Sequence, residues 1–229
     1  MQDLKKFEEK INVDFKNQCL LQQALVHRSY INEHPDFELG HNERLEFLGD
    51  AVLELVTTEN LYYNYENPEG ELTNWRAALV NGPMLAKIAH RIGVEEFLFL
   101  SRGEAKDKNP KARNYILANA MEAIIGAIYL DQGWDVSKKF ITENILTELP
   151  EILEKKLYID SKSRFQEASQ EKTGITPSYQ VLSESGPDHN KKFVIGIYLE
   201  DELVAEGEGT SKQEGQMNAA EKALEVKGW

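Results

Sequence analysis

The chain has 229 residues, with 26 Lys and Arg residues, 39 Asp and Glu residues and a formal net charge of −13 at pH 7. Because one domain usually has about 100 to 150 residues, we expect two domains. No apolar run approaches the roughly 20 residues that a membrane helix needs and no signal-peptide core follows the first residues, so we expect a cytoplasmic protein. The single cysteine, Cys19, excludes an internal disulfide, and its apolar surroundings predict a small core residue.

The segment 41–55, HNERLEFLGDAVLEL, has the spacing of an amphipathic helix. Its acidic side is predicted to carry Glu43, Glu46, Asp50 and Glu54, and its apolar side Leu45, Leu48, Val52 and Leu55. Glu46 and Asp50 are i, i+4 neighbours, which repel each other unless a positive charge lies between them. The pair therefore suggests half of a metal site, and the alternative is the acidic stripe of an ordinary surface helix.

A group of bases follows in a segment that contains Pro and Asn and is expected to be a loop. Its members are Lys106, Lys108, Lys111 and Arg113. The net charge argues at first sight against a nucleic-acid partner, because phosphate binding needs a positive potential, but the placement of bases matters more than the sum. This group is placed to hold a nucleic-acid backbone over the next helix, and a solvated loop is an equal alternative.

The segment 116–130, ILANAMEAIIGAIYL, is apolar around nearly the whole helical circumference and predicts a buried helix. Glu122 is its only charge, and Asn119 lies one turn before it on the same face. A buried carboxylate must be protonated, paired or bound to a cation, because burying an unpaired charge costs on the order of several kcal/mol. If this helix crosses the acidic helix, oxygen ligands from both form a site that Mg²⁺ prefers, which suggests phosphodiester chemistry. The alternative is a neutral or salt-bridged structural acid.

The pattern changes near residues 150–160, where helices give way to strands, so we expect domains at 1–157 and 158–229. In the second domain we expect a helix at 161–172, strands at 179–185, 192–200 and near 203–208, and a last helix that opens at Ser211. Ser211 and Glu214 fit the S-x-x-E capping box, and the packing side of this helix is Ala219, Ala220, Ala223 and Leu224. The predicted fold class is an all-α domain followed by a small α+β domain in the order α-β-β-β-α.

The motifs of the first domain resemble those of the ribonuclease III family. NERLEFLGDAVLEL at residues 42–55 is similar to the signature motif, and ILANAMEAIIGAIYLD at 116–131 is similar to the second acidic motif. FKNQCLLQQALVHRSYINEH at 15–34 and GELTNWRAALVNGPMLAKIA at 70–89 extend the likeness. The signature motif is long and rarely met by chance.

This resemblance implies an all-helical endonuclease domain that uses Mg²⁺, with Mn²⁺ as a substitute. Carried over by position, the metal ligands are Glu46, Asp50, Asn119 and Glu122, with Asp50 and Glu122 as the catalytic pair and Glu43 as a supporting acid. The family usually has an aspartate where this chain has Asn119. A carboxamide oxygen can still ligate Mg²⁺ but is neutral, so we expect the metal affinity to fall.

The second domain resembles the double-stranded RNA-binding domain. Its landmarks are Phe165-Gln166-Glu167, Pro177-Ser178-Tyr179, Gly186-Pro187-Asp188-His189, Gly207-Glu208-Gly209, Ser211-Lys212 and Asn218-Ala219-Ala220. The resemblance implies RNA contacts by Gln166, Glu167, His189 and Lys212 across successive grooves. Gln213 replaces a common lysine, and Gly215 replaces the usual alanine at a cost of up to about 1 kcal/mol of helix propensity. From Asp160 onward 8 Lys and Arg stand against 13 Asp and Glu, a net charge of −5, so we expect weak or salt-sensitive binding.

The resemblance also implies a symmetric homodimer of the catalytic domain, with Phe47 as a candidate interface residue; a place in the intrachain core fits the sequence equally well. The predicted function is Mg²⁺-dependent cleavage of double-stranded RNA that leaves 5′ phosphates, 3′ hydroxyls and short 3′ overhangs. Ribosomal precursors and other structured transcripts are the expected substrates. One alternative is a double-stranded RNA-binding protein weakened or silenced by Asn119, and another is a structural dimer of acidic helices without an RNA role.

Overall fold

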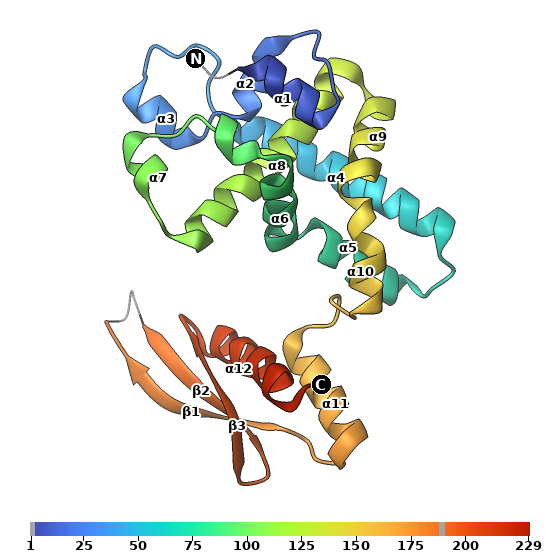
Figure 1. Ribbon diagram of the computed structural model, residues 1–229, viewed down its shortest axis with the longest axis vertical. Coiled ribbons are helices and arrows are strands. Elements are labelled where there is room, and N and C mark those ends of the chain that lie inside the picture. The colour runs from blue at the N-terminus through green and yellow to red at the C-terminus, as the bar shows by residue number, and fades with distance from the viewer. Residues whose placement is uncertain (1–2, 188–190) are drawn as a thin grey trace. The chain divides into compact units, whose positions relative to one another are not determined.

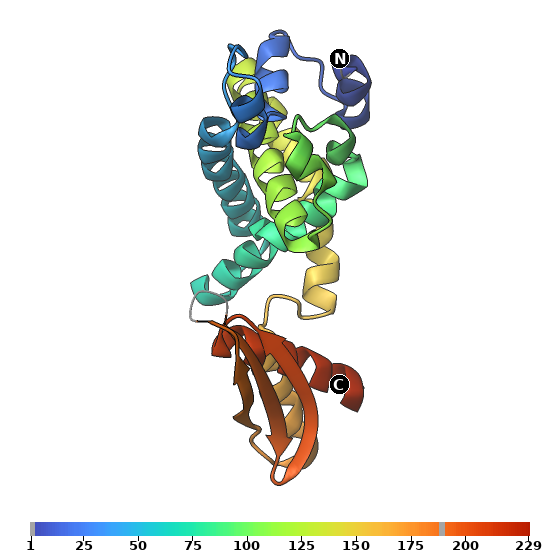
Figure 2. The same cartoon turned by 90° about the vertical axis from the view of Figure 1, so that its left-hand side faces the viewer.

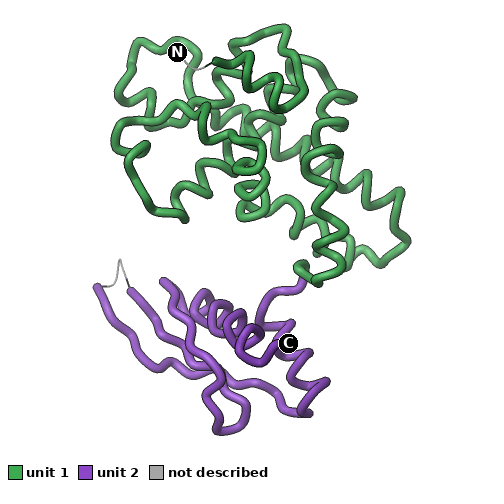
Figure 3. The backbone as a smooth tube through the Cα atoms, viewed as in Figure 1, with its two compact units in different colours: residues 1–158 green, residues 159–229 purple. Residues whose placement is uncertain are grey.

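The computed structural model describes residues 3–187 and 191–229 and divides the chain into two compact units, Met1–Tyr158 and Ile159–Trp229 (Figure 3). The first unit is helical, and the second has a helix, three antiparallel strands and a final helix. The predicted fold class is confirmed. No helix in the described part of the chain is long and apolar enough to cross a membrane.

The first unit is built around one buried helix, α8 (Figure 1). The unit contains α1 (Leu4–Ile11), α2 (Gln18–Ala24), α3 (Arg28–Glu33), α4 (Glu43–Asn64), α5 (Glu69–Val80), α6 (Gly82–Ile92), α7 (Arg102–Lys106), α8 (Pro110–Gln132), α9 (Trp134–Asn144) and α10 (Leu149–Glu154), with 3-10 turns η1 (Val94–Phe97) and η2 (Leu146–Glu148). Helix α8 packs against α2, α4, α6 and α9. The prediction of a buried helix is confirmed by the run from Ile116 to Ile128, in which only Asn119 and Glu122 are not buried.

Two apolar predictions in this unit are wrong. Leu55 was expected on the packed side of α4, but it is 58% exposed, and Val52, Leu53 and Val56 carry the buried side of this part of the helix. Cys19 was expected in the core, but it is exposed at the start of α2, where the side chain of Asn17 caps the helix by accepting from the Cys19 N–H at 3.1 Å. Leu21 and Ala24 carry the buried side of that helix instead.

Helices α4 and α8 cross at two glycines with their backbones in contact. A Cβ atom added to Gly49 would lie 1.7 Å from the carbonyl oxygen of Glu122, and one added to Gly126 would lie 2.2 Å from that of Leu45. Only glycine permits so close an approach of two main chains. The crossing places the turn of α4 that carries Glu46 and Asp50 beside the turn of α8 that carries Glu122.

Two carboxylates, those of the buried Glu8 and of the partly exposed Asp131, hold the N-terminal segment against this helical core. Glu8 is 1% exposed and accepts from the Phe15 N–H at 2.6 Å and from Gln18 Nε2 at 2.7 Å. Asp131, at the end of α8, accepts from the N–H groups of Lys16 and Asn17, both at 2.8 Å. These acids satisfy main-chain donors of the segment between α1 and α2, so this segment is held to α1 by Glu8 and to the end of α8 by Asp131.

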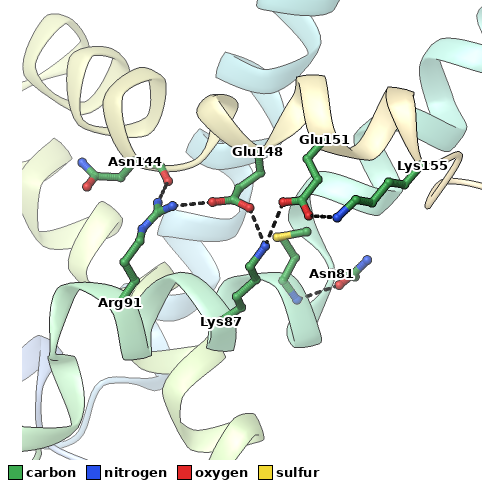
Figure 4. Close-up of polar contacts among 8 residues, drawn as sticks. Asn81, Lys87, Arg91, Asn144, Glu148, Glu151 and Lys155 are labelled. Atoms are coloured by element: carbon green, nitrogen blue, oxygen red, sulfur yellow. Dashed lines mark hydrogen bonds and ion pairs between the residues drawn. The ribbon is translucent and has the colours of Figure 1, made fainter.

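An ion-pair network holds η2 and α10 on α6 (Figure 4). Glu148 is buried and pairs with Arg91 and, at 2.8 Å, with Lys87. Lys87 also lies 3.3 Å from Glu151, which pairs with Lys155 at 2.6 Å. Shared hydrogen bonds with these carboxylates raise the pKa of Lys87 above its ordinary value, and those with Lys155 and Lys87 lower the pKa of Glu151. The last helix of this unit is therefore fixed by charge as well as by its apolar side.

The second unit is a three-stranded antiparallel sheet with both helices on one face (Figure 2). It contains α11 (Ser161–Thr173), β1 (Ser178–Ser185), β2 (Lys192–Leu199), β3 (Glu202–Gly209) and α12 (Lys212–Lys227), in the strand order β1-β2-β3. The predicted packing side of α12 is confirmed, since Ala219, Ala220, Ala223 and Leu224 are all buried. The predicted cap is also present: the Ser211 hydroxyl accepts from the Glu214 N–H at 3.1 Å, while the Glu214 carboxylate accepts from the Thr210 N–H at 2.8 Å.

Gly215 has a packing role that its helix propensity does not reveal. A Cβ atom at this position would lie 2.6 Å from Cγ1 of Ile195 on β2, and one at Gly207 on β3 would lie 2.1 Å from the backbone nitrogen of Ala219. The glycine therefore lets α12 lie close to the sheet. The expected cost in helix propensity is therefore accompanied by a packing contact, because a larger residue at 215 would have to displace the side chain of Ile195.

We predict that Gly126→Ala destabilises the first unit by more than about 2 kcal/mol, because the new Cβ must displace the α4 backbone rather than a flexible side chain. Urea unfolding followed by circular dichroism measures this change. Gly70→Ala on α5 is the matched control, because a Cβ there meets nothing within 4 Å, so the substitution should be neutral or stabilise by up to about 1 kcal/mol. Equal effects of the two substitutions would contradict the close crossing.

Candidate functional site

The site lies where α4 and α8 cross. Helix α4 carries Glu46 and Asp50 one turn apart, and α8 carries Asn119 and Glu122 one turn apart on the facing side. The side chain of Asn119 forms a hydrogen bond with Glu46, and Glu122 lies close enough to feel the charges of both Glu46 and Asp50. The fold therefore places four of the sequence-predicted site residues around one crossing.

The carboxyl groups at the crossing destabilise one another's charge. Burial, together with the nearby charges of Asp50 and Glu46, raises the pKa of Glu122 from 4.5 to about 7. Burial also raises the pKa of Glu46, with Glu43 and Asp50 adding to the rise and the hydrogen bond from Asn119 opposing it. For Asp50 the causes of a raised pKa are burial and then Glu54. At neutral pH this site therefore holds negative charge that its surroundings do not neutralise.

These residues fit a divalent cation by their chemistry. All four would offer oxygen atoms, which are the ligands of hard cations, and a cation would relieve the mutual repulsion that raises the pKa of Glu122. In residues 3–187 and 191–229, no three His, Cys, Asp or Glu side chains already form a metal-binding cluster. The fit therefore depends on the donor set and on the unneutralised charge of the crossing.

Glu43 stands apart from this group at the start of α4. Its carboxylate lies 3.7 Å from Nη1 of Arg28 and 3.7 Å from Nδ1 of His41, and its side chain is half exposed. It adds negative charge to the neighbourhood of Glu46 but belongs to the rim. This position agrees with a supporting acid rather than a ligand.

A hollow opens beside the crossing and shares two of its residues. It is lined by His27, Arg28, Ser29, Asn32, Asn42, Glu43, Glu46, Tyr115 and Asn119. Arg28 and Tyr115 were not among the predicted site residues, although the sequence places both near predicted ones. Arg28 lies in the segment 15–34, which resembles the ribonuclease III family, and Tyr115 precedes Asn119 by one helical turn.

The predicted basic loop is divided between two helices. Pro110 begins α8 and Asn109 caps it by accepting from the Lys111 N–H at 3.0 Å, so Lys111 and Arg113 are helical and the expectation of a loop is wrong for them. Lys106 ends α7, and Lys108 lies in the short connection. The side chains of Lys106, Lys108 and Lys111 are exposed.

Arg113, which was predicted to contact RNA, has a largely buried side chain that makes contacts within the first unit. Its side chain is 15% exposed, its Nη2 donates to the carbonyl of Glu104 at 2.8 Å, and its Nε lies 3.5 Å from the carboxylate of Glu95. The guanidinium therefore fastens the end of α7 to α8. We expect it to position the neighbouring lysines rather than to contact RNA.

In the second unit, the described RNA-contact candidates are exposed at separate places on the two helices. Gln166 and Glu167 lie on the exposed side of α11. Lys212 is the first residue of α12, where a helix N-terminus already favours phosphate, and its Nζ lies 5.9 Å from the centre of the Phe193 ring. His189 lies outside the described residues.

Phe47 is 82% exposed, so its alternative place in the intrachain core is wrong. It lies on α4 beside a second hollow whose apolar lining includes Leu20, Leu48 and Leu130. The same side of α4 carries the exposed Leu55 and Tyr62 farther along the helix. An exposed apolar stripe of this kind on a soluble helix indicates an interaction surface.

Comparisons with known proteins agree with both units. Residues 17–149 match the model of the family described as Ribonuclease-III-like, and residues 161–227 match that of the double-stranded RNA binding motif. The chain is 41% identical over 226 residues to Ribonuclease 3 of Dehalococcoides mccartyi, covering 98% of this chain and 95% of that protein. It is 41% identical to Ribonuclease 3 of Borreliella burgdorferi, with 97% and 91% covered.

A solved structure of the nuclease domain of ribonuclease III from Campylobacter jejuni is also similar, with a TM-score of 0.57 and 39% identity. The match covers 65% of this chain and 99% of that one. The description of that structure notes structural flexibility in a region involved in dimer formation.

A helical nuclease domain with an acidic helix crossing, followed by a double-stranded RNA-binding motif, defines a class of enzymes that cut structured RNA. The chain belongs to the ribonuclease III family, and it is an endoribonuclease specific for double-stranded RNA. This membership overturns the alternative of a structural dimer of acidic helices without an RNA role.

We predict that Glu122 makes the free energy of unfolding fall as the pH rises from about 4.5 to about 7 in the absence of divalent cations. In this range the folded protein binds a proton that the unfolded chain has lost, so the neutral form stabilises the fold and the charged form does not. Glu122→Gln does not titrate, so its stability relative to the parent should increase across this range.

Urea unfolding at a series of pH values, with a chelator present, measures the two curves. Glu225→Gln, an exposed change on α12, is the control and should follow the parent. Parallel curves for the parent and Glu122→Gln would contradict the raised pKa.

Proposed function

We propose that this enzyme hydrolyses the phosphodiester bonds of double-stranded RNA at the crossing of α4 and α8 with Mg²⁺, for which Mn²⁺ can substitute. The observation that carries the proposal is the set of four oxygen-bearing side chains at the crossing, in which Glu122 is partly buried and has its pKa raised to about 7 by burial and by its neighbours Asp50 and Glu46. When bound, the cation would supply an activated water and stabilise charge on the phosphate oxygens.

The four site residues would divide these tasks by position. Glu46, Asp50, Asn119 and Glu122 would be the ligands, with Asp50 and Glu122 as the catalytic pair. A proton on Glu122 would compete with the cation, so we expect occupancy of the site to increase as the pH passes about 7. Glu43 would support the site as a negative charge at its rim, next to Arg28 and His41.

Asn119 would weaken this site without removing it. Its carboxamide forms a hydrogen bond with Glu46, which favours the charged form of that carboxylate. An aspartate there would instead add a negative charge, raising both the repulsion in the empty site and the attraction for a cation. The alternative function, an RNA-binding protein in which Asn119 prevents turnover, differs from the leading proposal only in this residue.

The RNA would be held by both units. In the second unit, Gln166, Glu167, His189 and Lys212 would contact successive grooves of the duplex, as expected for a domain that recognises A-form shape. In the first unit, the exposed Lys106, Lys108 and Lys111 would contact the backbone near the N-terminus of α8. Arg113 would keep this basic group in place.

The enzyme would act as a homodimer through its nuclease domain. Phe47 exposes most of a phenyl ring beside an apolar hollow, and the stripe that continues through Leu55 and Tyr62 supplies a self-complementary surface of the kind that isologous dimers bury. Two sites across one duplex would cut both strands and leave 5′ phosphates, 3′ hydroxyls and short 3′ overhangs. Ribosomal precursors and other structured transcripts in the cytoplasm would be the substrates.

We predict that Asn119→Asp lowers the Mg²⁺ concentration required for cleavage of a long, perfectly paired RNA by about tenfold or more, because it restores one anionic ligand. A Mg²⁺ titration of cleavage measures the midpoint for both forms. Asn74→Asp on α5 adds the same charge outside the site and should not change the midpoint.

Cleavage by both forms would support a tuned enzyme, and cleavage by Asn119→Asp alone would support the RNA-binding alternative. Cleavage by neither would overturn the proposed site.

We predict that Phe47→Asp converts the dimer to a monomer, because a charge cannot be buried in an apolar interface without a partner. Sedimentation equilibrium measures the mass of the particle. Val226→Asp changes a similarly exposed apolar residue on α12, 66% exposed, and should leave the mass unchanged. A dimer that persists in Phe47→Asp would place the interface elsewhere.

A further inference from the structure

The hollow beside the acidic crossing joins two kinds of side chain. Glu46 and Asn119 belong to the crossing, whereas Arg28 and Tyr115 bring hydrogen-bond donors from α3 and from the first turns of α8. An RNA strand that reaches the acids must bring its own negative phosphates into an acidic neighbourhood. A donor beside the site would offset that repulsion.

We propose that this hollow holds the sugar-phosphate backbone of the strand being cut, with Arg28 paired with a phosphate next to the scissile bond and the Tyr115 hydroxyl donating to a neighbouring backbone oxygen. The inference rests on the proposed function of the acidic crossing. It assigns two residues outside the proposed ligand set to substrate binding.

Arg28 has the charge and the freedom that this role requires. Among the described residues, it is the one Lys or Arg that lines the hollow, and its side chain is 70% exposed. Its partner Glu43 is 3.7 Å away and half exposed, so the pair is longer than a hydrogen bond and contributes little. A phosphate can therefore displace Glu43, since the planar guanidinium can donate two parallel hydrogen bonds to phosphate oxygens.

Tyr115 extends the functional face of α8 by one turn. Residues 115, 119 and 122 follow the i, i+4, i+7 spacing, so the phenol lies in line with Asn119 and Glu122. Tyr115 is 68% exposed and directly precedes the buried run of α8 that begins at Ile116. An exposed ring with a polar tip suits a ribose, because the ring can cover the sugar while the hydroxyl donates to an oxygen.

The wall of the hollow is preorganised. The Ser29 hydroxyl lies 2.9 Å from Nδ1 of His27 and accepts from the Ser101 N–H at 3.1 Å, which ties the start of α3 to the segment before α7. The buried Asn42 donates its N–H to the carbonyl of Val26 at 3.0 Å and its side-chain amide to that of Ala24 at 3.2 Å. The backbone that carries Arg28 is thus held in place, so only its side chain must be ordered when substrate binds.

Arg28→Gln and Tyr115→Phe test the inference in whichever form of the enzyme cuts, either the chain as it stands or Asn119→Asp. Lys139→Gln on α9 is the matched loss of one exposed positive charge, with a side chain 62% exposed and outside the hollow. Single-turnover cleavage of a short RNA duplex, measured over a range of enzyme and salt concentrations, gives half-saturation, maximal rate and salt dependence separately.

We expect Arg28→Gln to raise the half-saturation concentration about tenfold, with a smaller rise for Tyr115→Phe, and to reduce the slope of log affinity against log salt by about one. An RNA with a neutral methylphosphonate at one position beside the cut should lose affinity for the parent but little for Arg28→Gln. Lys139→Gln should behave as the parent in each measurement.

Two results would overturn the inference while leaving the nuclease function intact. One is cleavage by Arg28→Gln with unchanged half-saturation and salt slope. The other is an equal loss from the methylphosphonate in the parent and in Arg28→Gln at every position tested. Failure of every form to cut would instead overturn the proposed function itself.

Discussion

The contact between the backbones of α4 and α8 is the constraint on which the rest of the nuclease domain depends. Gly49 and Gly126 have no Cβ, so each main chain lies against the other and the two helices cannot rotate or separate without losing that contact. The rotation of each helix decides which side chains face the crossing. Because α4 carries Glu46 and Asp50 one turn apart and α8 carries Asn119 and Glu122 one turn apart, this single contact determines the composition of the site.

The same contact brings carboxylates close enough to repel one another, and this repulsion favours the binding of a cation. Helix α8 is buried on nearly all sides, so Glu122 loses much of its hydration while Asp50 and Glu46 place further negative charge beside it. Such an arrangement costs stability in the absence of a cation and favours cation binding in return. Asn119 reduces the repulsion, since its amide gives Glu46 a neutral hydrogen-bond donor in place of a third negative neighbour.

Both units use small residues where an element must approach closely, and both place their polar functions at the edges of these contacts. In the second unit Gly207 and Gly215 let α12 lie on the sheet, and the exposed N-terminus of that helix begins at Lys212. In the first unit the hollow with Arg28 and Tyr115 adjoins the glycine crossing. The close packing at these glycines holds the helices rigidly, and the exposed side chains next to them are available to bind RNA.

The sequence alone determined the elements and the chemistry on their faces. The periodicity of 41–55 and 116–130 was sufficient to predict the two helices and the Glu46–Asp50 and Asn119–Glu122 spacing, because these depend on local spacing. The alternation of the strands and the S-x-x-E cap at Ser211 were sufficient for the order of the second domain. Only the tertiary structure decided which faces are covered. In the folded protein Leu55 and Phe47 are exposed, Arg113 donates a hydrogen bond to the carbonyl of Glu104, and Gly215 packs closely against Ile195. Spacing within one helix carries no information about how near another element lies, and nearness decides burial, pKa and access to the site.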